Sequence, residues 1–145
     1  MAQPQIRTLL IEDNPADARL LAIRLNEVPN HGVDVTRASR LTEGMRRLET
    51  EPFDLVLLDL SLPDSKGPAT LDLVHAKFPN VPILLLTGFA DVDYARAALR
   101  SGARDYLVKG SFDGRVLLQS MHHAIERQRM HTRLERNGEV ARSGA

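Results

Sequence analysis

Five polar side chains that could perform chemistry each follow or end a short apolar run in this sequence. They are Glu12, Asp13, Asp59, Thr87 and Lys109. A single acidic residue in such a place is usually a solvated loop residue or a helix cap. Three carboxylates held close together, however, would repel one another and gain proton affinity unless a cation joined them. Carboxylate oxygens suit Mg²⁺ or Mn²⁺, so the acidic residues are candidate metal ligands.

A hydroxyl and an ammonium group beside such a cation would suit a dianionic group. Thr87 can donate a hydrogen bond to a phosphoryl oxygen, and Lys109 can neutralise another. One of the carboxylates could then serve as the nucleophile, because aspartyl phosphate formation is an established covalent strategy. These residue types therefore indicate phosphoryl chemistry, provided that the fold brings them together.

The apolar runs have the length of strands buried on both faces. Five of them recur, at 6–11, 33–38, 53–60, 81–87 and 105–108. Segments with helical spacing begin near Pro15, Leu41, Gly67, Asp91 and Ser111. Asn14 can cap the first of these helices, and Pro15 suits its first turn. The alternation predicts a doubly wound α/β domain, with a five-stranded parallel sheet and helices on both faces.

Ligands of doubly wound sheets lie outside the carboxyl ends of the strands, where the strand order reverses. Adjacent strands are about 5 Å apart, so residues that end neighbouring central strands share one pocket. We therefore expect the five polar residues to meet at one edge of the sheet.

The composition of the chain limits the classes of protein to which it can belong. The 145 residues favour one domain, and 43% hydrophobic with 26% charged residues is ordinary for a chain that folds in water. Nineteen basic and nineteen acidic residues balance, so we expect no direct binding of nucleic acid. The chain has no cysteine, which excludes disulfides and thiolate sites. Without a signal-like or membrane-spanning apolar stretch, we expect a cytoplasmic protein with no membrane contact.

The apolar face of the last helix thins beyond Ile125, where the chain becomes rich in arginine and polar residues. We expect one domain over 1–127, followed over 128–145 by a helical extension and a disordered tail. Three histidines of this helix lie at positions that look solvated, so we expect no zinc site among them. They are His122, His123 and His131.

Four motifs carry the polar residues in order: LLIEDN, LVLLDLSLPDSKG, LLLTG and DYLVK. Together they resemble the receiver domain of two-component response regulators, from about Ile6 to about Arg127. The resemblance implies a flavodoxin-like fold and phosphorylation of Asp59 by a histidine kinase or a histidine phosphotransfer protein. It also implies that the product is a conformational state, so the protein would not be an enzyme, apart from slow autodephosphorylation.

The resemblance assigns roles around the metal. It implies that Asp13 and Asp59 coordinate Mg²⁺ directly, together with the backbone carbonyl of Ser61. Glu12 would act through a water molecule. Receivers often have aspartate at the position of Glu12, and the extra methylene of glutamate suits this indirect role.

The resemblance also assigns a switch. Thr87 and Lys109 would contact the phosphoryl oxygens, and Tyr106 would change rotamer with phosphorylation. The affected surface would bind partners or pair two copies through exposed ion pairs. Its charged residues are Arg96, Arg100, Asp105 and Arg115.

Two positions concern hydrolysis of the phosphoryl group. In receivers, the residues that border the approach of water to phosphorus correspond to Ser61 and Phe89. Phe89 has no group that could orient water, so we expect a long-lived phosphorylated state.

Receivers commonly have proline after the active-site lysine, often with a cis peptide, whereas this chain has Gly110. A cis bond before a residue other than proline costs about 3 kcal/mol, so we expect the loop 109–111 to follow another path.

Two other functions use similar residues. A haloacid-dehalogenase-type phosphatase also has an aspartyl nucleophile, but that family needs a second aspartate where this chain has Ser61. A pseudo-receiver would keep the fold as a binding module without phosphorylation, and the intact polar set argues against it. The output remains open between a stand-alone receiver that acts on a downstream protein effector and a piece joined to a sensor or kinase module.

Overall fold

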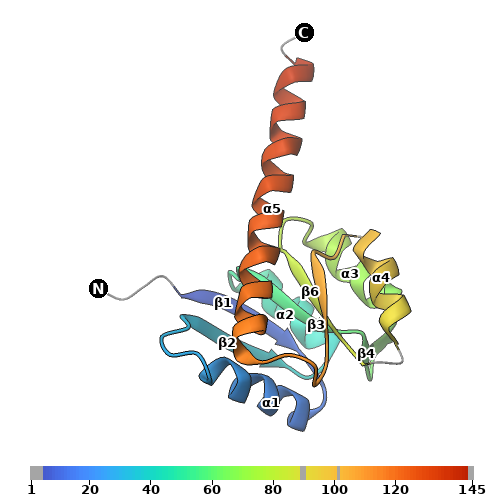
Figure 1. Cartoon of the computed structure of the whole chain (residues 1–145). Helices are drawn as coiled ribbons and strands as arrows, with labels where there is room; N and C mark the ends of the chain where they lie inside the picture. The colour runs from blue at the N-terminus through green and yellow to red at the C-terminus, as the bar shows by residue number, and fades with distance from the viewer. Residues whose placement is uncertain (1–4, 89–90, 101, 144–145) are drawn as a thin grey trace.

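We describe the protein from a computed structural model, which describes residues 5–88, 91–100 and 102–143. Its strands are β1 (Ile6–Ile11), β2 (Val33–Ala38), β3 (Leu55–Asp59), β4 (Ser61–Leu62), β5 (Ser65–Lys66), β6 (Ile83–Thr87) and β7 (Asp105–Val108). Its helices are α1 (Pro15–Asn26), α2 (Leu41–Thr50), α3 (Pro68–Lys77), α4 (Val92–Arg100) and α5 (Gly114–Ser143). Figure 1 shows their arrangement.

The main sheet has five parallel strands in the order β2-β1-β3-β6-β7. The chain moves outward from β1 to β2, then returns to β3 on the other side of β1. The strand order therefore reverses between β1 and β3, which is where a doubly wound sheet binds its ligands. This topology confirms the fold predicted from the apolar runs.

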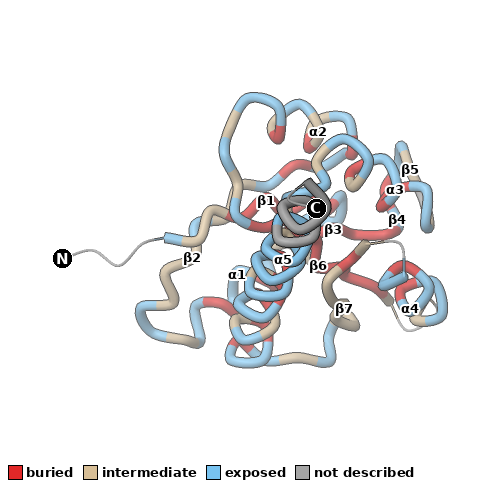
Figure 2. Tube along the Cα trace, turned by 90° about the horizontal axis from the view of Figure 1, so that it is seen from above, coloured by how far each residue is buried: buried red, intermediate tan, exposed pale blue. Residues whose placement is uncertain are grey.

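Two layers of helices cover the sheet because successive strand residues point to opposite faces. On one face, Leu9 and Ile11 of β1 pack in the core with α2, α3 and α4. On the other face, Leu10 packs with α1 and α5. Figure 2 looks down α5 and shows that the buried residues concentrate in the central strands. β3 and β6 are buried throughout, so their carboxyl ends have fixed positions.

The first helix begins as the sequence predicts. The Asn14 side chain accepts hydrogen bonds from the backbone N–H groups of Ala16, at 2.9 Å, and Asp17, at 3.3 Å. Pro15 occupies the first helical position, where its missing N–H has no cost. The cap therefore defines the start of α1 next to the end of β1.

The short hairpin of β4 and β5 is not anticipated by the sequence analysis. It begins at Ser61, two residues after Asp59, and its turn holds Asp64. The two carboxylate oxygens of Asp64 accept hydrogen bonds from the N–H groups of Leu41, at 2.9 Å, and Thr42, at 3.1 Å. Asp64 thus caps α2 from a distant segment, since Arg40 at the N-cap makes no side-chain cap hydrogen bond.

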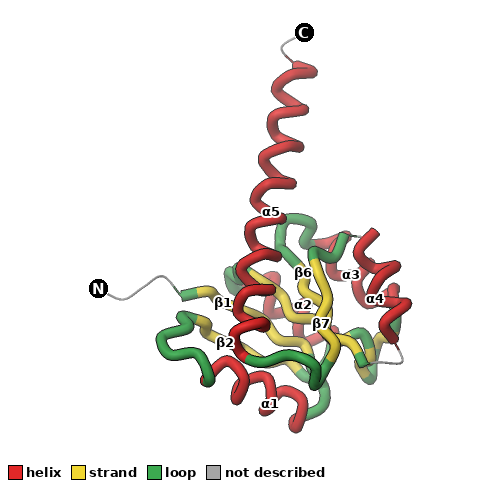
Figure 3. The backbone as a smooth tube through the Cα atoms, in the orientation of Figure 1, coloured by secondary structure: helices red, strands yellow, loops and turns green. Residues whose placement is uncertain are grey.

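The loop after β7 departs from the path that proline would impose. Gly110 has a φ of 80°, which lies in the left-handed region that glycine allows and proline cannot reach. No cis peptide bond occurs in the described ranges. α5 then begins at Gly114, three residues later than expected from Ser111, and continues as a helix to Ser143. It rises well beyond the strands (Figure 3), and the fraying of its last residues stays a prediction.

Candidate functional site

The acidic residues meet at the carboxyl edge of the sheet. Glu12 and Asp13 follow β1, and Asp59 ends the neighbouring strand β3. One carboxylate oxygen from each residue lies within 4.8 Å of the others. Glu12 and Asp59 are buried, with 1% and 4% of their surface exposed, whereas Asp13 is exposed. The sheet therefore brings together the three carboxylates that the sequence analysis selected.

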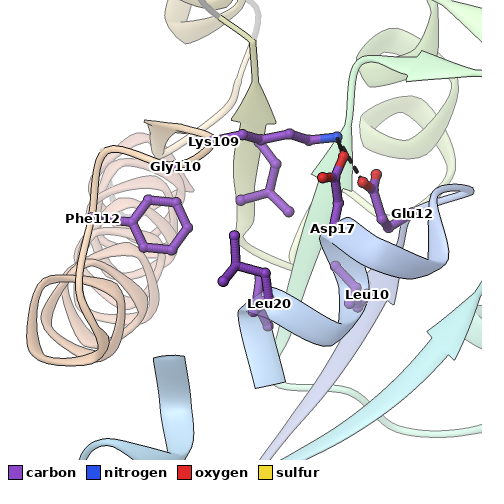
Figure 4. Close-up of a pocket in the computed structure, with 9 residues that line it drawn as sticks. Leu10, Glu12, Asp17, Leu20, Lys109, Gly110 and Phe112 are labelled. Atoms are coloured by element: carbon purple, nitrogen blue, oxygen red, sulfur yellow. Dashed lines mark hydrogen bonds and ion pairs between the residues drawn. The ribbon is translucent and has the colours of Figure 1, made fainter. Parts of the chain in front are cut away.

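Lys109 reaches this cluster from the end of β7. Its Nζ lies 2.6 Å from Glu12 Oε1 and 3.3 Å from Asp59 Oδ2. A third carboxylate also contacts it, because Asp17 Oδ2 lies 2.9 Å away. Figure 4 shows the Lys109 side chain extended toward Asp17 and Glu12. The sequence analysis placed Lys109 correctly and missed Asp17.

A signal for Asp17 was present in the sequence. Asn14 and Pro15 mark the start of α1, so Asp17 falls in the first turn of that helix. This turn follows the end of β1 and hence lies at the same edge of the sheet as the other acidic residues. Acidic residues are common in first turns, where they stabilise the helix dipole, and the position alone does not reveal a distant partner.

Burial and charge shift the proton affinities of these groups. Burial is the main reason that the pKa of Glu12 rises to about 9, and the Asp59 carboxyl raises it further, while Lys109 opposes the shift. Burial disfavours the Lys109 ammonium, but its carboxylate partners outweigh that effect and raise the pKa of Lys109. The hydrogen bond from Lys109 lowers the pKa of Asp17. The site therefore has more acidic groups than one ammonium can balance.

The donor set fits a hard divalent cation. Glu12 Oε2 is buried and has no hydrogen-bond partner within the described part of the chain, and Asp13 and Asp59 offer further oxygens nearby. Mg²⁺ and Mn²⁺ prefer such oxygens. His122, His123 and His131 are all exposed on α5 and are not among the clustered groups.

The Asp59 carboxylate is held at both oxygens. Oδ1 accepts a hydrogen bond from the backbone N–H of Ser61 at 3.0 Å, and Oδ2 faces Lys109. Ser61 begins the hairpin of β4 and β5, and its side chain is exposed. The hairpin thus orients Asp59 through the backbone and leaves the side chain of Ser61 beside the site.

Thr87 and Tyr106 lie on neighbouring strands. Thr87 ends β6, is 1% exposed, and its hydroxyl donates to the carbonyl of Gly88 at 3.2 Å. The hydroxyl therefore points to backbone in this state and would have to turn to reach a group on Asp59. Tyr106 is half-buried on β7 and packs against the core that contains α4. Phe89, expected near the path of water, lies outside the described residues.

Comparison with curated proteins finds response regulators. FleR, a response regulator protein of Pseudomonas aeruginosa, is 36% identical over 120 residues, which cover 82% of this chain and 24% of FleR. The cell cycle transcriptional regulator CtrA of Caulobacter vibrioides is 31% identical over 126 residues, which cover 87% of this chain and 53% of CtrA. The chain thus spans about a quarter of FleR and about half of CtrA.

Solved structures and family models agree with this result. A CheY-like response regulator receiver domain protein from Methanospirillum hungatei has a TM-score of 0.73 and 26% identity, and the match covers 89% of this chain and 99% of that one. The family model of the response regulator receiver domain matches residues 8–122. These matches give no support to a phosphatase or a pseudo-receiver. The chain therefore belongs to the family of response regulator receiver domains.

Proposed function

We propose that this chain is a phosphoacceptor switch, in which Asp59 receives a phosphoryl group from a histidine kinase or a histidine phosphotransfer protein. One observation carries the proposal: a buried, oriented aspartate lies within 4.8 Å of two further carboxylates and 3.3 Å from a lysine ammonium. Such a constellation costs stability through repulsion and desolvation, and its residue types suit phosphoryl transfer.

The reaction forms one bond and breaks one. A carboxylate oxygen of Asp59 attacks phosphorus, and the bond from phosphorus to the imidazole nitrogen of the donor breaks. The electron pair of that bond returns to the imidazole, which takes a proton from water. Lys109 offsets charge on the phosphoryl oxygens, and the Thr87 hydroxyl turns from the Gly88 carbonyl to donate to one of them.

The acidic residues would hold a divalent cation during this reaction. Asp13 and Asp59 would bind it directly, with the carbonyl of Ser61, and Glu12 would act through water. A bound Mg²⁺ would neutralise part of the negative charge on the phosphoryl group. Glu12 supports this arrangement, because its Oε2 is buried and has no hydrogen-bond partner among the described residues.

The output would be a changed surface. When the Thr87 hydroxyl turns toward Asp59, it leaves space into which Tyr106 can rotate, and the face formed by α4, β7 and α5 changes with it. A downstream effector, a fused sensor or kinase module, or a second copy of the chain would read this face. Asp105 is already engaged within the chain, since Arg127 lies 4.0 Å from it.

The relatives widen the range of outputs. CtrA is by name a transcriptional regulator, so the balanced charge of this chain does not exclude nucleic acid as a target of a longer protein.

No helix in the described ranges is long and apolar enough to cross a membrane.

The phosphorylated state would be long-lived. Ser61 and Phe89 correspond to the residues that border the approach of water, and Phe89 has no group to position it. Part of the positioning contribution to hydrolysis is then absent.

Incubation with acetyl phosphate and Mg²⁺, followed by intact mass measurement, tests the proposed function. A phosphoacceptor gains one labile phosphoryl group per chain. Continuous release of phosphate without retained label would instead indicate a phosphatase. A chain that neither gains the group nor releases phosphate would be a binding module.

A further inference from the structure

Asp17 is bound to Lys109, and the proposed chemistry gives it no role. Its Oδ2 lies 2.9 Å from Lys109 Nζ, closer than the 3.3 Å contact with Asp59. Glu12 Oε1 is closer still, at 2.6 Å. An ammonium group has three N–H donors. Two of them are donated to Glu12 and Asp17, and the ammonium is also paired with Asp59, so its partners come from the end of β1, from α1 and from β3.

Phosphorylation changes what this ammonium must contact. Formation of the acyl phosphate removes the negative charge of the Asp59 carboxylate and introduces phosphoryl oxygens beyond its end. Lys109 needs at least one donor for these oxygens, and to follow them it must move away from one of its remaining partners. Glu12 is 1% exposed, so water cannot readily replace the ammonium there, whereas the Asp17 side chain is 37% exposed and can be hydrated again.

We propose that Asp17 is a positioning residue that holds Lys109 toward α1 in the unphosphorylated state and competes with the phosphoryl group for its ammonium. The proposal rests on the proposed function, because it assumes that Asp59 is the acceptor. It differs from the roles of Glu12 and Asp13, since Asp17 is not one of the residues expected to bind the cation.

The surroundings leave room for this exchange. A cavity of about 200 Å³ borders the ion pair and has an apolar lining. Figure 4 shows Leu10, Leu20 and Phe112 around this space, with Lys109 and Asp17 at its edge. The pair therefore has space beside it that the core does not fill.

Release of Asp17 would act on one end of α1. The far end is fastened to α5, where Glu27 Oε1 accepts a hydrogen bond from the N–H of Gly114 at 2.9 Å. A Cβ at Gly114 would also overlap the carbonyl oxygen of Arg24, so the two helices are in close contact there. The first turn of α1 is therefore the part that loosens when Lys109 leaves Asp17.

Beryllofluoride affinity tests the competition. The ligand stands in for the phosphoryl group, and its affinity is measured at saturating Mg²⁺ so that a change in cation binding does not contribute. Asp17→Asn should bind beryllofluoride about two- to fivefold more tightly than the wild type, the range expected from a partly exposed ion pair. Asp17→Glu, which restores the charge, should return the affinity toward the wild-type value. Asp72→Asn, an exposed aspartate on α3, is the matched control and should match the wild type.

Hydrogen exchange in the first turn of α1 is a second measurement, and it would not respond to beryllofluoride if Asp17 only stabilised the fold. Beryllofluoride should raise exchange in the first turn of α1 in the wild type, where the Ala18 N–H donates to the Asn14 carbonyl. In Asp17→Asn this turn is already released, so beryllofluoride should leave its exchange unchanged.

Two results separate this inference from the proposed function. If the wild type binds beryllofluoride and Asp17→Asn binds it equally or more weakly, Asp17 does not compete and the inference alone is overturned. If the wild type neither binds beryllofluoride nor gains a phosphoryl group, the proposed function is wrong and the inference falls with it.

Discussion

Lys109 and Glu12 are separated by 97 residues in the chain, yet Lys109 Nζ lies 2.6 Å from a Glu12 carboxylate oxygen. The contact joins the last strand of the sheet to the end of the first. Two further carboxylates share the same ammonium, so the pair sits in a region of excess negative charge. Binding of a divalent cation should therefore stabilise the folded protein.

Mg²⁺ should raise the thermal midpoint of unfolding, because it binds the assembled carboxylates and not the unfolded chain. At a concentration of 100 times Kd the gain is about 2.7 kcal/mol. Asp13→Ala should remove both this gain and Mg²⁺-dependent phosphorylation. Circular dichroism in Mg²⁺ and in chelator measures the shift, with Asp34→Ala, an exposed aspartate of β2, as control. Equal shifts in Asp13→Ala and the wild type would contradict the assignment of Asp13.

Asp59→Asn should abolish phosphoryl incorporation from acetyl phosphate. The amide is not a nucleophile of comparable strength, and the substitution keeps the shape of the side chain, so the fold should stay compact. Intact mass and peptide mapping measure incorporation and its position. Label on another residue of the substituted protein would show that Asp59 is not the acceptor.

Beryllofluoride should change the hydrogen exchange of α4, β7 and the start of α5. The expected cause is that the Thr87 hydroxyl leaves the Gly88 carbonyl and lets Tyr106 turn. Thr87→Ala, which lacks the hydroxyl, should bind beryllofluoride but show a reduced change on this face. A wild-type protein that binds beryllofluoride with no change there would refute the switch.

Phe89→Asn and Phe89→Glu should lose the phosphoryl group faster than the wild type, because each adds a polar group that can orient water. Decay of the phosphorylated mass at fixed Mg²⁺ gives the rates. Identical rates for the three proteins would mean that Phe89 does not shield the group and that a partner sets its lifetime.

Asp64→Ala should destabilise the fold by about 1 kcal/mol, the usual cost of losing a helix cap. Burial opposes ionisation of Asp64, but the N–H groups of Leu41 and Thr42 outweigh it and hold its pKa below the ordinary 3.8. A lowered pKa means that the carboxylate stabilises the folded state above pH 3.8, and that this gain disappears as the pH falls through the folded pKa. Urea unfolding of both proteins across this window measures the difference. A difference that does not shrink on acidification would contradict the role of the charge, and Asp72→Ala should show neither effect.

The sequence allowed prediction of the features that depend on repeated patterns. β3 and β6 are continuous apolar runs, and the residues that end them fall at the predicted edge of the sheet. The hairpin of β4 and β5 could not be found this way, because two residues per strand are too few to show a period. The cap that Asp64 provides for α2 depends on that hairpin and was missed with it.

Asp17 shows the same limit at the site. Its partner Lys109 is 92 residues away in the chain. The sequence does not show which side chains come into contact when the end of a strand lies beside the first turn of a helix. The direction of the Thr87 hydroxyl was also beyond the sequence, because a rotamer depends on its local acceptors. Residue types at strand ends predicted the set of groups, and only the coordinates gave their partners.

The length of α5 has a mechanical consequence. The helix has 30 residues, and at 1.5 Å per residue a tilt of about 5° at its base moves its far end by about 4 Å. Its base lies against the C-terminal end of α1 at Gly114, so that contact is where a tilt of the helix would pivot. A displacement too small to alter contacts at the sheet becomes, at the other end of α5, as large as the diameter of a methyl group.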